Sequence, residues 1–317
     1  MPEIRRIAFF GTPAFAVPTL AALVAAGRAP SLVVTQPARP VGRGGRVTEP
    51  PVATWAREHG LAVAQPEKVR DPAFLEQLEQ LAPDLAVVVA FGQIFPRRLL
   101  AIPRLGCVNV HASLLPRWRG AAPIQAAIAA GDPVTGVTTM QMVFELDAGP
   151  MLLSREVPIG AQETAGELAA RLAELGAQLL VETVDGLERG ALVAREQNPA
   201  QVTFAGLLSR QDGQVDWTLP ASRLFDRLRA YTPWPGLTAQ LDGRPVKIVA
   251  ARVAAPRAGA PGTVIAIENE ALVVACGEGT ALALTQLQRP GRGAVSGAEL
   301  FRGERLAAGA RFEVTVP

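Results

Sequence analysis

The first half of the chain alternates between short apolar runs and longer segments whose apolar residues recur at helical spacing. The apolar runs, which are typical of buried strands, lie at residues 5–10, 31–35, 61–64, 85–90 and 107–110. The segments with helical spacing lie at residues 17–26, 52–59 and 73–81. Because strands that alternate with helices pair in parallel, the pattern predicts a doubly wound, mostly parallel α/β sheet with helices on both faces.

The middle of the chain changes to longer elements. A helix is expected around residues 124–130, paired strands at 136–143 and 151–159, and a long helix at 163–187. Residues 191–205 contain Asn198-Pro199 and show little periodicity, which favours a linker.

The C-terminal third has the pattern of a β-rich domain. After one expected helix at 220–230, short apolar strands are separated by turn signals at 242–243, 261–262, 278–279 and 290–291. Such a series predicts a small β-barrel. We therefore expect a domain over residues 1–190, a linker over 191–205 and a barrel over 206–317.

Composition narrows the class of protein. Hydrophobic residues make up 49% and charged residues 19% of the 317, as in folded globular proteins. No apolar run approaches the ~18 residues of a membrane span, and we expect no signal or transit peptide. The two cysteines lie in apolar runs, which argues against a disulfide scaffold or a zinc site. These features predict a cytoplasmic protein that binds no metal ion and does not associate with a membrane.

The charge distribution is uneven although the net charge is only +2. Residues 206–317 hold 13 basic and 10 acidic side chains, whereas residues 1–205 hold 18 and 19. An acidic partner would therefore meet the C-terminal part and local basic loops. The first turn, Gly11-Thr12-Pro13, does not have the pattern GxGxxG, and the pattern GxxxxGK[ST] does not occur in the sequence. Both observations argue against a dinucleotide or ATP site.

The densest polar cluster follows the expected strand at 107–110. Asn109 and His111 are two residues apart, so a strand places both side chains on one face, at the end where ligands bind in open α/β sheets. An Asn amide can donate to a developing oxyanion, and a His can donate likewise or carry a proton. Asp147, in the segment ELDAGP after a strand-like run, could orient the imidazole.

These residues belong to longer segments that resemble the 10-formyltetrahydrofolate-dependent formyltransferase family. The segments are IAFFGTPAFAVPTL, QPARPVGRG, QPEKV, PDLAVVVAFGQIFP, HASLLPRWRGAAPIQAAIAAGD and TGVTTMQMVFELDAGPML. The stretch QVDWTLPASRLFDRLRAYTPWPG resembles the members that act on tRNA. The resemblance covers the whole chain. It implies a Rossmann-like formyltransferase domain followed by an OB-like barrel that binds tRNA.

The same resemblance implies a reaction and a set of site residues. A formyl group would move from 10-formyltetrahydrofolate to the α-amino group of methionine on initiator methionyl-tRNA, with Asn109, His111 and Asp147 as catalytic residues and no metal. The folate pterin would lie against the backbone of residues 88–94 and 140–147. The implied folate-binding residues are Val88, Val89, Ala90, Phe91, Gly92, Ile94, Ser113, Leu114, Leu115, Pro116 and Asp147.

A basic loop and one later arginine are the implied contacts to tRNA. The residues are Arg39, Arg43, Arg46 and Arg210. Arginine pairs with phosphates and stacks on exposed bases. Relatives often carry lysine where Gly45 and Leu207 stand here, which reduces the basic charge at both places. We expect the protein to act as a monomer.

Two other functions remain open at this point. A sister enzyme that formylates an amino-sugar nucleotide, or one that hydrolyses formyl-folate, would share the Asn-His-Asp core; the arginine loop and the basic C-terminal part favour tRNA. A catalytically silent folate-sensing or RNA-binding module would be favoured by loss of Asn109, His111 or Asp147, and all three are present.

The arginine loop yields a prediction that separates a tRNA substrate from a small molecule. Replacing Arg43 and Arg46 together by Ala should weaken binding of charged tRNA and remove about two counterion-release equivalents from its salt dependence. Affinity for the folate and the thermal midpoint should barely change, because Gly-rich loops contribute little to a core. Measuring tRNA affinity at several salt concentrations for wild type and the double variant tests this prediction. Equal affinities and equal salt dependence would show that the loop does not bind nucleic acid.

Overall fold

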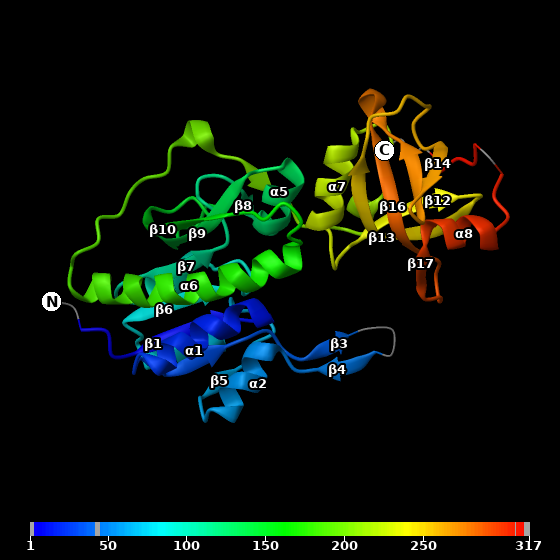
Figure 1. Ribbon diagram of the computed structural model, residues 1–317. Coiled ribbons are helices and arrows are strands. Elements are labelled where there is room, and N and C mark those ends of the chain that lie inside the picture. Colours follow the sequence, from blue (N-terminus) through cyan, green and yellow to red (C-terminus); the bar gives the residue numbers. More distant parts are fainter. Residues whose placement is uncertain (1–2, 42–44, 308, 314–317) are drawn as a thin grey trace. The chain divides into compact units, whose positions relative to one another are not determined.

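The computed structural model describes residues 3–41, 45–307 and 309–313 (Figure 1). The chain divides into two compact units. The first unit comprises residues 1–123, 134–158 and 169–205, and the second comprises 124–133, 159–168 and 206–317. In the part of the chain that the structure describes, no helix combines the length and the apolar character required to cross a membrane.

A seven-stranded sheet forms the centre of the first unit. Its strands are β1 (Ile7–Gly11), β2 (Leu32–Val34), β5 (Val63–Ala64), β6 (Leu85–Val89), β7 (Cys107–His111), β9 (Val134–Gln141) and β10 (Met151–Pro158). They lie in the order β10-β9-β7-β6-β1-β2-β5. The five neighbouring strands β7, β6, β1, β2 and β5 pair in parallel. Strand β9 pairs antiparallel with β7, and β10 pairs antiparallel with β9. The predicted mostly parallel sheet is confirmed.

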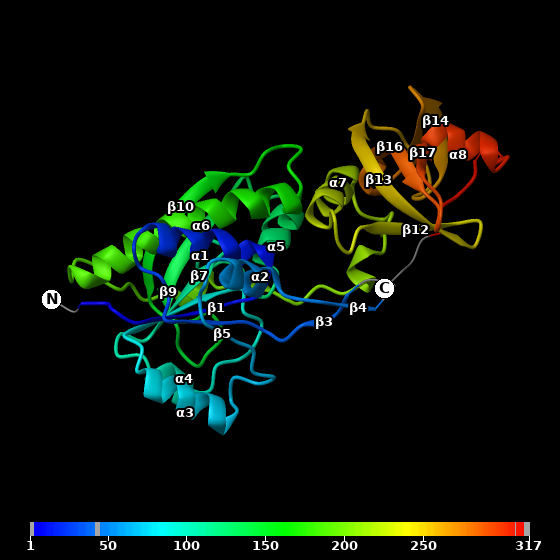
Figure 2. The ribbon, with the colours of Figure 1, turned by 90° about the horizontal axis from the view of Figure 1, so that it is seen from below.

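Helices cover both faces of this sheet. They are η1 (Ala14–Ala16), α1 (Val17–Ala25), α2 (Pro51–Glu58), α3 (Pro72–Leu81), α4 (Arg97–Ala101) and α6 (Ala165–Glu188). Figure 2 shows α1 and α6 on one face and α3 and α4 on the other. The chain leaves β1 for β2 and later returns to the other side of β1 with β6. Such a reversal of strand order marks the place where open α/β sheets bind ligands.

An aromatic cluster fixes the loop that follows β6. The ring of Phe10 lies 5.5 Å from that of Phe91 and 4.9 Å from that of Phe95, with Phe74 at 6.5 Å. All four side chains are buried. Because Phe91 and Phe95 come directly after β6, burying their rings anchors the backbone at the carboxyl end of that strand.

Two regions of the first unit contain short elements that the sequence analysis did not predict. The basic loop that carries Arg39 and Arg46 contains an antiparallel pair of strands, β3 (Arg39–Val41) and β4 (Arg46–Thr48). The expected linker contains η2 (Pro199–Gln201) and β11 (Phe204–Ala205), which pairs in parallel with β8 (Arg119–Gly120). Strands of two or three residues are too short to show a period of two in the sequence.

The C-terminal part of the second unit is β-rich, as expected. Its strands are β12 (Leu237–Leu241), β13 (Arg244–Ala254), β14 (Val264–Glu268), β15 (Ala271–Ala275), β16 (Ala281–Gln288) and β17 (Ala294–Ser296). They are antiparallel in the order β12-β13-β16-β15-β14, with β17 beside β16. The unit's helices are α5 (Pro123–Ala130), η3 (Gln211–Gly213), α7 (Ala221–Ala230), η4 (Gly277–Gly279) and α8 (Gly297–Gly303).

The expected closure into a barrel takes a different form. Within the described residues, the edge strands β12 and β14 do not pair with each other. A segment near the C-terminus bridges both edges instead: Val264 N donates to Ala310 O at 2.8 Å, and Glu313 N donates to Gln240 O at 2.9 Å. Isolated bridges replace a continuous ladder there, which turn signals in a sequence do not reveal.

A buried arginine ties α8 to the β12–β13 hairpin. Arg289 is 9% exposed, and its Nε donates to Glu304 Oε1 at 2.7 Å. Its Nη1 donates to the carbonyl oxygens of Arg244 and Pro245 at 2.6 and 3.0 Å. The hydrogen bond from Arg289 lowers the pKa of Glu304 below its ordinary value. These bonds offset the cost of removing the guanidinium from water.

We expect Arg289→Met to destabilise the β-rich domain by roughly 3 kcal/mol, since Glu304 keeps only its 3.1 Å ion pair with the exposed Arg244 and two backbone carbonyls lose their hydrogen bonds from the guanidinium. Because the folded pKa of Glu304 is lowered, the pairing stabilises above the unfolded value of 4.5 and is lost as the pH falls through the folded value. The difference in unfolding free energy between wild type and variant should therefore narrow as the pH falls below 4.5. Denaturant unfolding at several pH values measures it.

The matched control is Arg302→Met, which removes an arginine from an ion pair with Glu270 whose side chains are 63% and 61% exposed. Exposed pairs contribute only ~0–1 kcal/mol. An equally small effect of Arg289→Met at neutral pH would contradict the structural role of the buried pair.

Candidate active site

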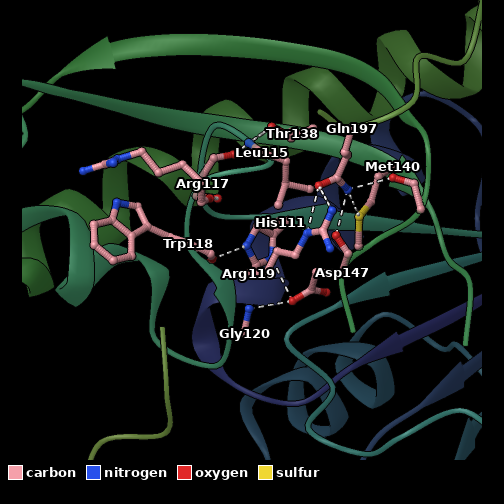
Figure 3. A network of polar contacts seen from close by, with 12 residues as sticks. His111, Leu115, Arg117, Trp118, Arg119, Gly120, Thr138, Met140, Asp147 and Gln197 are labelled. Atoms are coloured by element: carbon pink, nitrogen blue, oxygen red, sulfur yellow. Dashed lines mark hydrogen bonds and ion pairs between the residues drawn. The ribbon is translucent and has the colours of Figure 1, made fainter. Parts of the chain in front are cut away.

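Two polar side chains extend from β7 on the same face of the sheet. Asn109 is half-buried, and its backbone lies between Val88 of β6 and Met140 of β9. None of the described residues hydrogen-bonds its carboxamide. His111 is 6% exposed, and its Nε2 donates to Trp118 O at 2.9 Å (Figure 3). The structure thus places both residues together, as the spacing of two predicts.

Asp147 reaches His111 because the loop that carries it doubles back. Strand β9 ends beside the start of β7, where Met142 N donates to Cys107 O at 2.7 Å. Residues 142–147 then lead the chain back to the other end of β7, so that Asp147 Oδ2 lies 3.8 Å from His111 Nδ1. The same oxygen accepts a hydrogen bond from Gly120 N at 2.8 Å. The three residues proposed from the sequence are therefore neighbours.

A main-chain carbonyl fixes the imidazole ring. Trp118 O can only accept, so the proton of a neutral His111 ring resides on Nε2, and Nδ1 faces Asp147. The contact to Asp147 has the length of an ion pair rather than of a hydrogen bond. Trp118 adopts a left-handed backbone with φ of +62°, and its N–H donates to Thr203 Oγ1 at 2.8 Å. No side-chain pattern in a sequence reveals a main-chain acceptor, so Trp118 was not anticipated.

Hydrogen bonds hold the turn between His111 and Trp118. Thr138 Oγ1 donates to Ser113 O at 2.7 Å and accepts from Leu115 N at 3.2 Å. Ser113 Oγ donates to Arg117 O at 2.6 Å. Ser113, Leu115 and the cis-bonded Pro116 are buried, so their side chains shape the turn. Leu114, half-buried, lies against β9.

The residues expected to line the folate pocket fall into two groups. Val88, Val89 and Phe91 are 5%, 0% and 2% exposed, so their side chains belong to the core. Ala90 and Gly92 are exposed and have φ of +46° and +82°, and Ile94 is 83% exposed. A ligand at this strand end would meet backbone groups and the Ile94 side chain.

A buried thiol lies on the same strand as the polar pair. Burial raises the pKa of Cys107 to about 12. Its thiolate is the nucleophilic form, and at neutral pH almost none is present. Cys107 is therefore a core residue, which leaves the amide, the imidazole and the carboxylate as the candidate reactive groups.

The basic residues singled out for tRNA lie on two units. Arg39, on β3, and Arg210, which precedes η3, are exposed. Arg46 belongs to β4, where its backbone pairs with Val41. Arg43 lies outside the described residues.

A half-buried carboxamide beside an imidazole and a carboxylate is suited to transfer of a group at a carbonyl carbon. The sequence pattern of the family "Formyl transferase" matches residues 5–184, and that of "Formyl transferase, C-terminal domain" matches residues 207–305. The chain belongs to the formyl transferase family.

Curated relatives match over nearly the full length. The methionyl-tRNA formyltransferase of Anaeromyxobacter dehalogenans (strain 2CP-C) is 51% identical over 303 residues, which are 95% of this chain and 97% of the relative. That of Geobacter sulfurreducens is 46% identical over 307 residues, 97% of this chain and 96% of the relative.

Solved structures of low identity share the fold. An N-formyltransferase from Helicobacter canadensis, in complex with folinic acid and dTDP-3-aminofucose, has a TM-score of 0.67 at 15% identity and covers 89% of this chain and 99% of its own. HypX from Aquifex aeolicus, in complex with tetrahydrofolic acid, has a TM-score of 0.63 at 16% identity. That match covers 96% of this chain and 48% of HypX.

Proposed function

We propose that this protein transfers the formyl group of 10-formyltetrahydrofolate to the α-amino group of methionine on initiator methionyl-tRNA. The observation that carries the proposal is the 46–51% identity, over at least 95% of the chain, to relatives named methionyl-tRNA formyltransferase. The neighbouring placement of Asn109, His111 and Asp147 supports it, because these groups match what the reaction needs.

The site fits a folate donor. The exposed backbone of Ala90 and Gly92 offers hydrogen-bonding groups at a strand end, as a flat heterocycle with donors and acceptors requires. The buried side chains of Ser113, Leu115 and Pro116 would then support the pocket from behind. When bound, 10-formyltetrahydrofolate supplies the formyl group. Among the described residues, no cluster of three metal-ligating side chains occurs.

Asn109 would donate to the formyl oxygen as negative charge develops on it. Each such donor contributes ~3–4 kcal/mol to stabilisation of a transition state in a preorganised site. The backbone on both sides of Asn109 is fixed by pairing with Val88 and Met140, so the amide needs little rearrangement when the charge forms.

His111 and Asp147 would handle the proton of the attacking amine. In the neutral ring Nδ1 is free of hydrogen, because Nε2 donates to Trp118 O. Nδ1 can accept the proton that the amine loses on forming its bond to carbon, and the carboxylate 3.8 Å away stabilises the resulting cation. In the protonated ring, Nδ1–H becomes a second donor to the formyl oxygen. When the adduct collapses, the bond between the formyl carbon and N10 would break, and the imidazolium would return its proton to N10, so that tetrahydrofolate leaves and the ring is neutral again. A free α-amine, with a pKa near ~8, needs little other activation.

The acceptor would bind through the basic residues, with catalysis in residues 1–190, a linker at 191–205 and tRNA binding by residues 206–317. Arg39 and Arg210 are exposed and could contact phosphates. Exposed Leu207 and Gly45 lack the lysines of relatives, so these two positions would add no charge.

The acceptor is tested directly by parallel assays. Purified protein and 10-formyltetrahydrofolate are incubated with methionine-charged initiator tRNA or with dTDP-3-aminofucose, and formyl label is counted on RNA retained by a filter and on the isolated sugar nucleotide. We expect label on the tRNA. Label on the sugar nucleotide alone would replace the proposal with amino-sugar formylation, and release of formate without transfer would indicate a hydrolase.

Removing the oxyanion donor should affect turnover rather than binding. We expect Asn109→Ala to lower kcat by ~100-fold or more while KM for the folate stays within about threefold. Asn109→Asp keeps the shape, replaces the donor by a second acceptor and should be at least as slow. Steady-state kinetics measure both variants; turnover of Asn109→Ala within threefold of wild type would remove this residue from the catalytic role.

The imidazole and the carboxylate should act as a unit. We expect His111→Ala to lower kcat by ~100-fold or more, and Asp147→Asn to cost far less in the His111→Ala background than in wild type. The Asn variant keeps an acceptor for Gly120 N, so the loop stays anchored. A double-mutant cycle on kcat gives the coupling. If the two losses simply multiply, the proposed pairing is wrong.

A further inference from the structure

The segment after α6 is bonded to the turns that form the site. Arg195 and Met151 exchange two main-chain hydrogen bonds, each of 2.8 Å. Farther along, Thr203 O accepts from Arg119 N at 2.9 Å, and Thr203 Oγ1 accepts from Trp118 N at 2.8 Å. Residues 195–205 therefore run along the same loops that carry Trp118 and Asp147.

Gln197 lies at the centre of this segment and is 8% exposed. Its Oε1 accepts from Nε and Nη2 of Arg119 at 3.0 and 2.7 Å. Since a guanidinium only donates, these bonds fix which end of the amide is oxygen. The Nε2 group then donates to Asp147 O at 2.7 Å (Figure 3). It also donates to Gly149 O at 2.8 Å. Both donors and the acceptor of the amide are used.

The loop around Asp147, to which Gln197 donates its hydrogen bonds, has an unfavourable backbone conformation that needs stabilising contacts. Asp147 has a left-handed backbone with φ of +46°, which costs ~1–2 kcal/mol in a residue with a side chain. Gly149 lies so close to β9 that a Cβ would stand 1.7 Å from Gln141 O. A small rotation of this backbone would move the Asp147 carboxylate away from His111.

We propose that Gln197 is a positioning residue of the active site: by holding the carbonyls of Asp147 and Gly149, it places the Asp147 carboxylate against His111, and Arg119 orients its amide. The inference rests on the proposed function only for the consequence in catalysis. The placement of the loop can be measured in the free protein.

The placement of the loop can be tested by NMR spectroscopy of the two histidines of the chain. In ¹H–¹⁵N spectra of the ring nitrogens, Gln197→Met, which keeps the length but removes both donors, should shift the His111 signals. His59 at the end of α2, stacked on Trp55, is the internal reference and should not move. The matched control Glu196→Met alters the exposed neighbour and should move neither. Unchanged His111 signals in Gln197→Met would overturn the proposal.

The kinetic arm asks whether Gln197 acts through Asp147. We expect Gln197→Met to lower kcat by about tenfold with KM for the folate within twofold, as for a lost transition-state interaction. In the Asp147→Asn background the same substitution should change kcat by less than twofold. An undiminished tenfold loss there would show that Gln197 acts elsewhere and would overturn the inference.

Two further comparisons keep the outcomes distinct. Gln197→Glu retains the acceptor for Arg119 but sets oxygen against the two carbonyls; it should also shift His111, and it replaces the Met variant if that one does not fold. Arg195→Ala, with its main-chain bonds to Met151 retained, should behave as wild type. If wild-type protein transfers no formyl group, the proposed function fails, while the His111 spectra still decide the role of Gln197.

Discussion

The return of residues 142–147 from the start of β7 to its end is the constraint on which the site depends. Strand β9 runs antiparallel to β7, so its end lies at the opposite end of the strand from His111. Without the fold-back, Asp147 would be remote from the imidazole. The amide of Gly120 holds its carboxylate, and Gln197 holds its backbone. Three segments far apart in the sequence thus determine one interatomic distance.

Sequence reasoning was most successful where side-chain period carries the information. The five buried residues of β6 and the spacing of Asn109 and His111 follow from apolar runs and a period of two, and the structure confirms the sheet and brings both side chains to one face. The sequence gives no indication that Gln197 and Trp118 contact the site, because their hydrogen bonds involve main-chain carbonyls. Residues 191–205, with no period, resemble a linker although hydrogen bonds tie them to the site.

The three proposed catalytic residues by themselves say little about the acceptor. In the proposed reaction Asn109, His111 and Asp147 would act on the developing oxyanion and the amine proton, which are common to every amine acceptor of a formyl group. Discrimination must come from groups that contact the rest of the acceptor. Exposed arginines such as Arg39 on the β3–β4 hairpin can bind phosphates of a nucleic acid or of a sugar nucleotide. A nucleic acid contacts more phosphates over a longer surface, so its binding depends more steeply on salt, and this dependence distinguishes the two acceptors.

Among the described non-glycine residues of the first unit, four have a positive φ, and three of them lie at the site. Ala90, Trp118 and Asp147 have φ of +46°, +62° and +46°, and each belongs to a loop beside Asn109 or His111, whereas Ala82 ends α3. Left-handed backbone is unfavourable for such residues and persists only where surrounding bonds over-determine it. The Phe91 and Phe95 rings anchor the first loop, Thr203 and His111 the second, and Gln197 the third. Folding therefore supplies the energy that orients the polar groups before substrate arrives, and little rearrangement is left for the chemical step.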